Sequence, residues 1–358
     1  MAEDVVNGQI SRTDVVKCSA CGADMIFDVE SGKLKCPYCG TSDDVEANAF
    51  ENERDFNSFD ESLISKEEGT VTYRCPNCHA ETVMREFGAS AKCPFCGATN
   101  IIALEDMPGL KPDAILPFKV TKDEASARSK KWVRGKLFAP SSLKKIFAPD
   151  KMEPVYQPAF SFDSDTVSRY DGRLGEDYTV TVGTGKNRRT ETRTRWYYVH
   201  GNHLKNFTNL VIEASPHLDQ KQMDKIGPFD IFNSVEYNKE FLAGFMAERH
   251  DISVNDGFAV AKNKMDAEIR SEIIAQYNAD RVDYLNVDTK HTRTAFKNML
   301  LPVYCCTFKF KSKVYNYFVN GRTGRVNGKT PLSPWKVGIA VVIGIALLFG
   351  IYKILTGN

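Results

Sequence analysis

The 358-residue sequence lacks a net charge of either sign, because 47 basic residues balance 46 acidic ones and leave +1. This balance excludes, for the chain as a whole, the strongly basic surface of a general nucleic-acid-binding protein. A disordered chain is excluded as well, since 42% of the residues are hydrophobic and 26% are charged. The length exceeds that of one compact core and predicts two or three folded units.

Nucleotide-binding loops are absent or incomplete. The segment GRVNGKT, which begins at Gly324, is one residue short of a Walker A loop and runs into Pro331, where a helix should begin. A second glycine-rich segment, at Gly183, has Asn187 in place of the hydroxyl group that would bind magnesium. Together with the absence of a GxSxG motif, these gaps predict that the protein is not an enzyme.

Two other signatures are also missing. His200 and His203 are separated by Gly-Asn and lack the helical HExxH context, so we do not expect them to bind a metal. The chain opens with Met1, Ala2, Glu3 and Asp4 and has no apolar run there, so we expect neither a secretory signal nor a transit peptide.

The near-zero net charge hides an uneven distribution. Residues 1–109 contain 20 acidic and 9 basic side chains, whereas residues 110–358 contain 26 acidic and 38 basic ones. The chain is therefore an acidic N-terminal region followed by a basic body.

The region 46–70 has the composition of an acidic linker. Within it, Phe56, Phe59 and Leu63 are spaced as one stripe of a short helix. The stripe either packs on the rest of the protein or is a docking segment for a partner, and the spacing leaves both open.

The C-terminal region contains a long uncharged apolar run, from Val337 to Tyr352. Counted over 335–355, a helix would measure about 31 Å at 1.5 Å per residue, which matches the hydrocarbon core of a bilayer. We expect a single transmembrane helix. Four basic residues precede it, so we place the bulk of the protein in the cytoplasm and the tail in the cell membrane; they are Arg322, Arg325, Lys329 and Lys336.

Within this helix, Ala340 and Gly344 form a small-xxx-small pair, which makes a homo-oligomer a candidate assembly. Two basic clusters precede it, around Lys131 and around Arg189. They are either solvated faces, a surface for anionic membrane lipid, or a surface for an acidic partner.

Eight of the ten cysteines form four CxxC pairs, and the last two pairs repeat the first two exactly 57 positions later. Each CxxC pair places two sulfur atoms on one tight turn, and two facing turns supply four thiolates to a tetrahedral ion. The eight predicted metal ligands are Cys18, Cys21, Cys36, Cys39, Cys75, Cys78, Cys93 and Cys96.

This pattern predicts two tandem zinc ribbons, at 15–45 and 71–105, each holding one structural Zn2+. Disulfides are disfavoured because we expect a reducing cytosolic environment, and redox pairs or iron are the remaining alternatives. Four cysteines per ion leave no coordination position for water, so neither site should be catalytic. The surrounding acidic residues favour docking of protein partners over binding of phosphate groups.

The body, residues 110–334, is predicted to be α+β with a mixed, mainly antiparallel sheet, because alternating segments are interrupted by two helical ones. A capping box at Thr121 predicts a helix to Arg134, and an apolar stripe predicts a second from Asp256 to Tyr277. Asn-Gly pairs at 320–321 and 327–328 predict turns.

The adjacent residues Cys305 and Cys306 fall on a predicted strand of the body and should point to opposite faces of the sheet. Both are expected to be buried and neither to bind a metal.

The doubled ribbons, the run LPVY from Leu301 to Tyr304, the segment VNGRTGRVNGKTP and the terminal apolar helix together resemble a family of bacterial membrane proteins with TFIIB-type zinc ribbons. Its members are often labelled as primosomal-helicase-like, a label that the missing motor motifs do not support here. The resemblance implies an association with phage-shock-protein-A-like and SPFH-type or virion-core-like proteins.

We therefore expect a tail-anchored, zinc-binding adaptor that recruits cytosolic protein partners to the bacterial inner membrane. The alternative is a membrane-tethered zinc-ribbon protein that binds nucleic acid through its basic body and its second ribbon.

Overall fold

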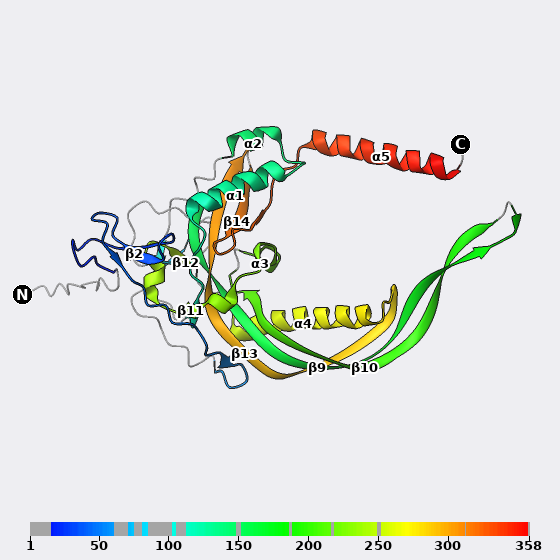
Figure 1. Cartoon of the computed structure of the whole chain (residues 1–358), viewed down its shortest axis with the longest axis horizontal. Coiled ribbons are helices and arrows are strands. Elements are labelled where there is room, and N and C mark those ends of the chain that lie inside the picture. Colours follow the sequence, from blue (N-terminus) through cyan, green and yellow to red (C-terminus); the bar gives the residue numbers. More distant parts are fainter. Residues whose placement is uncertain are drawn as a thin grey trace, which may run out of the picture.

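A computed structural model provides the structure of the chain (Figure 1). It describes residues 16–60, 71–74, 81–84, 102–104, 112–147, 152–185, 188–215, 218–248, 252–311 and 313–356. These residues form five α-helices, a three-stranded sheet near the N-terminus and a twelve-stranded sheet. Most strand pairs are antiparallel. Two pairs are parallel, namely β12 (Met246–Glu248) with β9 (Met152–Val182) and β13 (Arg281–Phe310) with β8 (Ala114–Ile115). The predicted α+β class with a mixed, mainly antiparallel sheet is confirmed.

Three very long strands form a curved sheet, which we call the arch: β9 (Met152–Val182), β10 (Arg189–Glu213) and β13 (Arg281–Phe310). β9 lies in the middle and pairs with both of the others in antiparallel register. At about 3.3 Å per residue, the 31 residues of β9 would extend for about 100 Å. The arch sweeps away from the rest of the molecule and ends in the β9–β10 hairpin (Figure 1).

Helix α4 (Val254–Gln276) lies along the concave side of the arch (Figure 1). Its buried stripe packs on aromatic side chains of the sheet and includes Val254, Gly257, Ala261, Met265, Ile269 and Ile273. A Cβ atom on Gly257 would lie 2.7 Å from Cδ2 of Phe160, so the helix approaches the sheet closely there. The predicted helix at 256–277 is confirmed to within a few residues.

The other end of the arch strands joins a smaller layer. Helix α1 (Lys122–Gly135) begins with the predicted capping box, in which the Glu124 backbone donates to the Thr121 hydroxyl and the Glu124 carboxylate accepts from the Thr121 N–H. The remaining elements here are α2 (Ser141–Ile146), α3 (Gln220–Ile226), η3 (Ile231–Asn233), β8 (Ala114–Ile115), β11 (Val235–Glu236), β14 (Lys313–Asn320) and β15 (Val326–Gly328).

One predicted turn is confirmed and one is wrong. Residues after Asn320 form the turn that leads from β14 to β15, and the Asn320 side chain accepts from the backbone N–H groups of Arg322 and Thr323. The pair Asn327-Gly328 lies inside β15, because it pairs with Phe318 and Tyr317 of β14. A Cβ on Gly328 would lie 2.3 Å from the Tyr317 Cβ, so the glycine is required by a close strand contact and not by a turn.

The described part of the acidic linker is extended and not helical. β4 (Arg54–Asp55) pairs with β13, and the Phe56 N–H donates to the Thr294 carbonyl at 3.0 Å. The rings of Phe56 and Phe59 pack on Phe296, at centroid distances of 6.3 and 4.9 Å. The predicted helix over this stripe is therefore wrong where the structure describes it, and both aromatic side chains pack on the protein itself. Leu63 lies outside the described residues.

Candidate metal centre and anchor helix

Four cysteines of the first CxxC repeat meet at one point. The Sγ atoms of Cys18, Cys21, Cys36 and Cys39 all lie within 4.8 Å of one another. Across the two turns, Cys18 Sγ lies 3.4 Å from Cys39 Sγ and Cys21 Sγ lies 3.5 Å from Cys36 Sγ. Half of the set is buried, Cys18 and Cys36, and the other half is exposed.

Two matching backbone turns bring these sulfur atoms together. In the first, the Gly22 N–H donates to the Cys18 carbonyl at 2.8 Å, and in the second the Gly40 N–H donates to the Cys36 carbonyl at 3.0 Å. Both glycines have a positive φ, +72° and +78°, which residues with a side chain rarely adopt. The hairpin between the turns contains β1 (Ile26–Asp28) and β2 (Lys33–Lys35), and β3 (Ser42–Asp43) extends it.

The residues present fit a metal ion. Four thiolates at 2.3 Å from one ion would stand about 3.8 Å apart in a regular tetrahedron. The two Sγ–Sγ distances across the turns are already close to that value, and small shifts of the cysteine side chains would complete the tetrahedron. The described cluster therefore could hold one metal ion, with all four positions filled by cysteine.

The thiols of the cluster differ in acidity. The hydroxyl and the backbone N–H of Thr41 stabilise the Cys39 thiolate and lower the pKa of Cys39 to about 6. The backbone N–H of Ala23 lowers the pKa of Cys21, but hydrogen bonds with Cys36 and Cys39 outweigh it and raise that pKa to about 12. Metal ligation requires thiolates, so an ion must displace protons from the less acidic thiols.

The ribbon is docked on the body through an aromatic contact. Phe27 in β1 is buried, and its ring lies 5.2 Å from Phe241 and 6.3 Å from Phe245, measured between centroids. Its backbone N–H donates to the Ala243 carbonyl at 2.9 Å. Phe241 belongs to η4 (Lys239–Leu242), which precedes β12 (Met246–Glu248) in the chain. The ribbon therefore shares a hydrophobic core with the body.

The second predicted set of ligands, Cys75, Cys78, Cys93 and Cys96, lies outside the described residues. The described backbone on either side forms β5 (Val71–Arg74), β6 (Glu81–Met84) and β7 (Ile102–Leu104). β5 pairs with both β6 and β7, and β12 joins β6 to β9. The region of the second repeat is thus connected to the arch by continuous strand pairing.

The other cysteines and histidines are not gathered into a site in the described structure. Cys305 and Cys306 are buried and belong to two different core clusters, one on each face of β13, as predicted. His203 Nε2 lies 3.0 Å from a carboxylate oxygen of Glu272 on α4. His200 is three residues away on the same strand and points to the opposite face.

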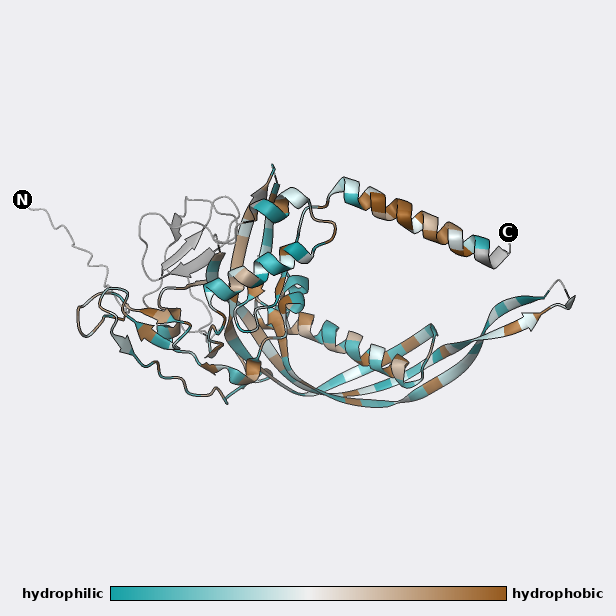
Figure 2. Cartoon of the chain, turned by 45° about the horizontal axis from the view of Figure 1, so that its top comes forward, coloured by the Kyte–Doolittle hydropathy of each residue, from teal (hydrophilic) through white to brown (hydrophobic). Residues whose placement is uncertain are grey.

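Helix α5 (Pro334–Thr356) is long and apolar enough to span a membrane. Its window Pro334–Lys353 has a mean hydropathy of 2.1 and is 0% buried. Figure 2 shows apolar residues along most of its length, whereas the arch is largely hydrophilic. The predicted bounds, 335–355, agree with the helix within one residue at each end.

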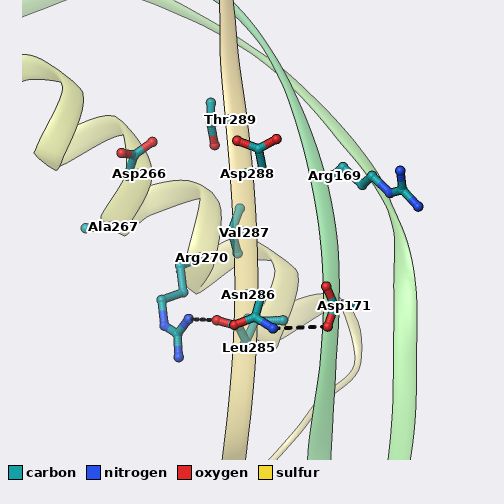
Figure 3. Close-up of a pocket in the computed structure, with 10 residues that line it drawn as sticks. All are labelled: Arg169, Asp171, Asp266, Ala267, Arg270, Leu285, Asn286, Val287, Asp288 and Thr289. Carbon is teal, nitrogen blue, oxygen red and sulfur yellow. Dashed lines mark hydrogen bonds between the residues drawn. The ribbon is translucent and has the colours of Figure 1, made fainter.

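A cavity of 640 Å³ lies between α4 and the arch (Figure 3). The Arg270 guanidinium donates to the Leu285 carbonyl, and the Asn286 amide donates to Asp171 at 3.1 Å. Its lining contains no cysteine, histidine or serine. None of the predicted site residues lies in this cavity.

Two features of the metal centre were not predicted from the sequence. Thr41 Oγ1 lies 3.1 Å from Cys39 Sγ, but the second repeat has Ala98 at the corresponding position, so the repeat does not point to the threonine. Docking through Phe27 joins residues more than two hundred positions apart, and no local periodicity reveals it.

Comparison with known proteins finds a distant relative. A protein of Bacillus subtilis (strain 168), described as "Uncharacterized protein YdjG", is 29% identical over 324 residues, which cover 90% of this chain and 91% of the relative. No family model matches the chain. No solved structure matches it either.

Proposed function

We propose that this chain is a tail-anchored, zinc-binding adaptor that holds cytosolic protein partners at the bacterial inner membrane. The observation that carries the proposal is the apolar helix α5, whose 20-residue window is 0% buried. An apolar helix whose spanning window is not buried in its own chain needs another apolar environment, and a bilayer provides one.

The orientation follows from charge. Lys336 lies at the N-terminal end of α5, and more basic residues precede it than follow it, so the body belongs on the cytoplasmic side. The arch cannot enter the hydrocarbon because exposed arginine and lysine side chains line its strands.

Zinc is the ion that we propose for the four-cysteine cluster. Thiolates are soft ligands, and a closed tetrahedral set of four is typical of structural zinc. The 57-residue repeat supports a second site of the same kind at Cys75, Cys78, Cys93 and Cys96. In this role each ion would hold a ribbon folded and leave its surface free for docking.

The outer face of the arch is the proposed surface for the partner. Strand pairing places Tyr198, Arg173 and Tyr284 in one row across β10, β9 and β13. The next row contains Val199 and Leu285, which face α4. Because adjacent rows of a sheet face opposite sides, the row of Tyr198, Arg173 and Tyr284 points away from α4.

The row has the composition of a protein interface. Tyr198 is 75% exposed and Tyr284 41% exposed. The Arg173 guanidinium lies 5.8 Å from the Tyr198 ring centroid and 5.5 Å from that of Trp196. Exposed tyrosine, tryptophan and arginine side chains on a rigid sheet are the residues that dominate protein interfaces. The sequence resemblance implies a phage-shock-protein-A-like or SPFH-type protein as the partner class.

The nucleic-acid alternative is less well supported by the described arginines near the hairpin tip. Arg189 and Arg193 both pair with Glu191, at 2.7 and 3.5 Å, and Arg195 pairs with Glu176 at 2.5 Å. Each such pair reduces the positive charge that phosphate groups would meet. Filter binding across a salt series tests this alternative, which predicts a steep loss of affinity with salt.

The experiment that tests the proposal separates anchoring from recruitment. A chain ending at residue 334 should lose both its own membrane attachment and that of the partner. Replacing Tyr198 and Tyr284 by alanine should release the partner while the chain stays in the membrane. Phe232→Ala, which removes an exposed side chain outside the arch, is the matched control and should change neither. Membrane attachment that persists in the truncated chain would refute the anchor.

A further inference from the structure

The turn between α1 and α2 exposes two large apolar side chains. Leu137 is 79% exposed and Phe138 is 42% exposed. We call residues 136–140 the α1–α2 tip. Figure 1 shows that it lies where the chain enters α5.

The α1–α2 tip is bonded to the residues that start the anchor helix. The Ser333 N–H donates to the Phe138 carbonyl at 2.8 Å, and the Lys336 Nζ donates to the Ala139 carbonyl at 2.8 Å. These bonds place Leu137 and Phe138 at the level of the first turn of α5. Wherever α5 enters a bilayer, the tip therefore lies at the same depth, in the interfacial region.

Two apolar side chains of the anchor segment extend this surface. Leu332 is 65% exposed and Trp335 is 78% exposed. Tryptophan is enriched at membrane–water interfaces, and an interfacial position also allows Lys336 to keep its charge in the headgroup region. The tip and the start of α5 thus form one apolar surface at the base of the anchor.

The exposure of the tip is built into the fold. Ala139, Leu143 and Val133 are buried together with Phe310, so the chain on both sides of Leu137 is held by the core. The Lys144 Nζ also donates to the Arg134 carbonyl at 2.7 Å and joins the two helices. The apolar pair points outward because its neighbours point inward.

Positive charge surrounds the apolar pair. Between Ala125 and Phe147 the sequence contains seven basic residues and no acidic one. Five of the basic side chains are exposed, namely Arg128, Lys130, Lys131, Arg134 and Lys145. An apolar wedge ringed by lysine and arginine is the pattern by which interfacial helices bind anionic lipid.

We propose that the α1–α2 tip docks on the anionic lipid surface into which α5 inserts, with Leu137 and Phe138 in the interface and the surrounding bases on lipid phosphates. The inference rests on the proposed anchoring by α5 and adds a second, charge-dependent contact. Because the α5 window is 0% buried and its Lys336 bonds to the tip, this contact is what fixes the body against the bilayer.

The test uses the full-length chain reconstituted in liposomes that carry acyl-chain-brominated lipid as a quencher. A Leu137→Trp variant adds a tryptophan at the tip, and Leu204→Trp adds one at a similarly exposed position on the arch. The emission of the unsubstituted chain is subtracted. We expect quenching of the added emission at position 137 and none at 204. Quenching at 137 should be greater with phosphatidylglycerol present than with phosphatidylcholine alone.

Charge variants complete the test. Replacing Lys131, Arg134 and Lys145 by glutamine should abolish the extra quenching at position 137 that phosphatidylglycerol causes. Replacing Arg188, Arg189 and Arg193, on the far hairpin, by glutamine removes the same charge and should leave this extra quenching unchanged. Emission at 137 that is unquenched, or quenched equally in both lipids, overturns the proposal.

Flotation of the same liposomes separates this inference from the proposed function. A chain that does not float with the lipid refutes the anchor itself. A chain that floats while position 137 stays unquenched refutes only the tip contact.

Discussion

Substituting Phe27 by alanine should detach the first ribbon from the body without emptying its metal site. The ring is 5% exposed and contacts Phe241 and Phe245 of the body. Truncating a buried phenylalanine to alanine costs about 3–5 kcal/mol. The backbone bond from residue 27 to Ala243 does not need the ring and should remain.

The loss should be local because the cysteine turns do not involve this side chain. The bonds that shape them join Gly22 to Cys18 and Gly40 to Cys36. The ribbon should therefore keep its ion and open more often as a unit. Since each 1.4 kcal/mol is a factor of ten, opening should increase by between about one hundred and several thousand fold.

Hydrogen exchange of the full-length protein in detergent, read by mass spectrometry over 16–45, measures this opening, and metal analysis is run beside it. Tyr38→Ala is the matched control, because Tyr38 lies in the same ribbon and is 83% exposed. The reasoning is refuted if both variants exchange alike, or if Phe27→Ala loses the metal. In the Phe27→Ala protein, a second substitution, Phe241→Ala, should increase ribbon opening less than it does in the unsubstituted protein, because the two rings form one contact.

Three further substitutions have defined outcomes. Gly257→Ala should lower the free energy of unfolding by about 1–3 kcal/mol, because the new Cβ would meet Phe160; this cost exceeds the gain from the better helix propensity of alanine. Ser271→Ala, on the exposed side of α4, is the control and should not lower it. Denaturant titration measures both variants. Burial and the nearby Glu248 raise the pKa of Glu213 in the folded state well above 4.5, so the folded state holds this proton more tightly than the unfolded state does. The free energy of unfolding should therefore fall as the pH rises from 4.5 through the pKa of the folded state. Glu213→Gln should abolish this fall, which is read from denaturation midpoints measured from acid to alkaline pH. Cys36→Ser should remove one metal ion per chain by elemental analysis.

Local chemistry allowed the elements with a strong sequence signal to be predicted. The CxxC spacing identified four cysteines that the structure brings together, the capping box identified the start of α1, and the apolar stripe identified α4. The uncharged run identified α5. Each of these signals depends only on residues close together in the chain.

The arch was predicted only in pieces. The segment around Gly172 is polar and contains glycine, so the alternation of polar and apolar residues stops there, yet β9 continues through it. A Cβ on Gly172 would lie 2.7 Å from the Tyr284 carbonyl oxygen, so β13 approaches too closely for a larger residue. The requirement comes from a partner strand more than one hundred residues away, which no local pattern contains.

The linker shows the same limit. The spacing of Phe56 and Phe59 fits a helical stripe. The segment instead pairs with β13, and both rings pack on the hydrophobic core between the arch and α4. Tertiary contact decided the conformation, as it also did for Asn327-Gly328 in β15.

Membrane recruitment of a candidate partner tests the central claim most directly. The fraction of a phage-shock-protein-A-like or SPFH-type protein from the same genome would be measured in the membrane pellet of cells that contain the full chain or residues 1–334. The adaptor account predicts that the partner is in the pellet with the full chain and in the soluble fraction with the truncated one. An equal distribution in both strains would contradict it.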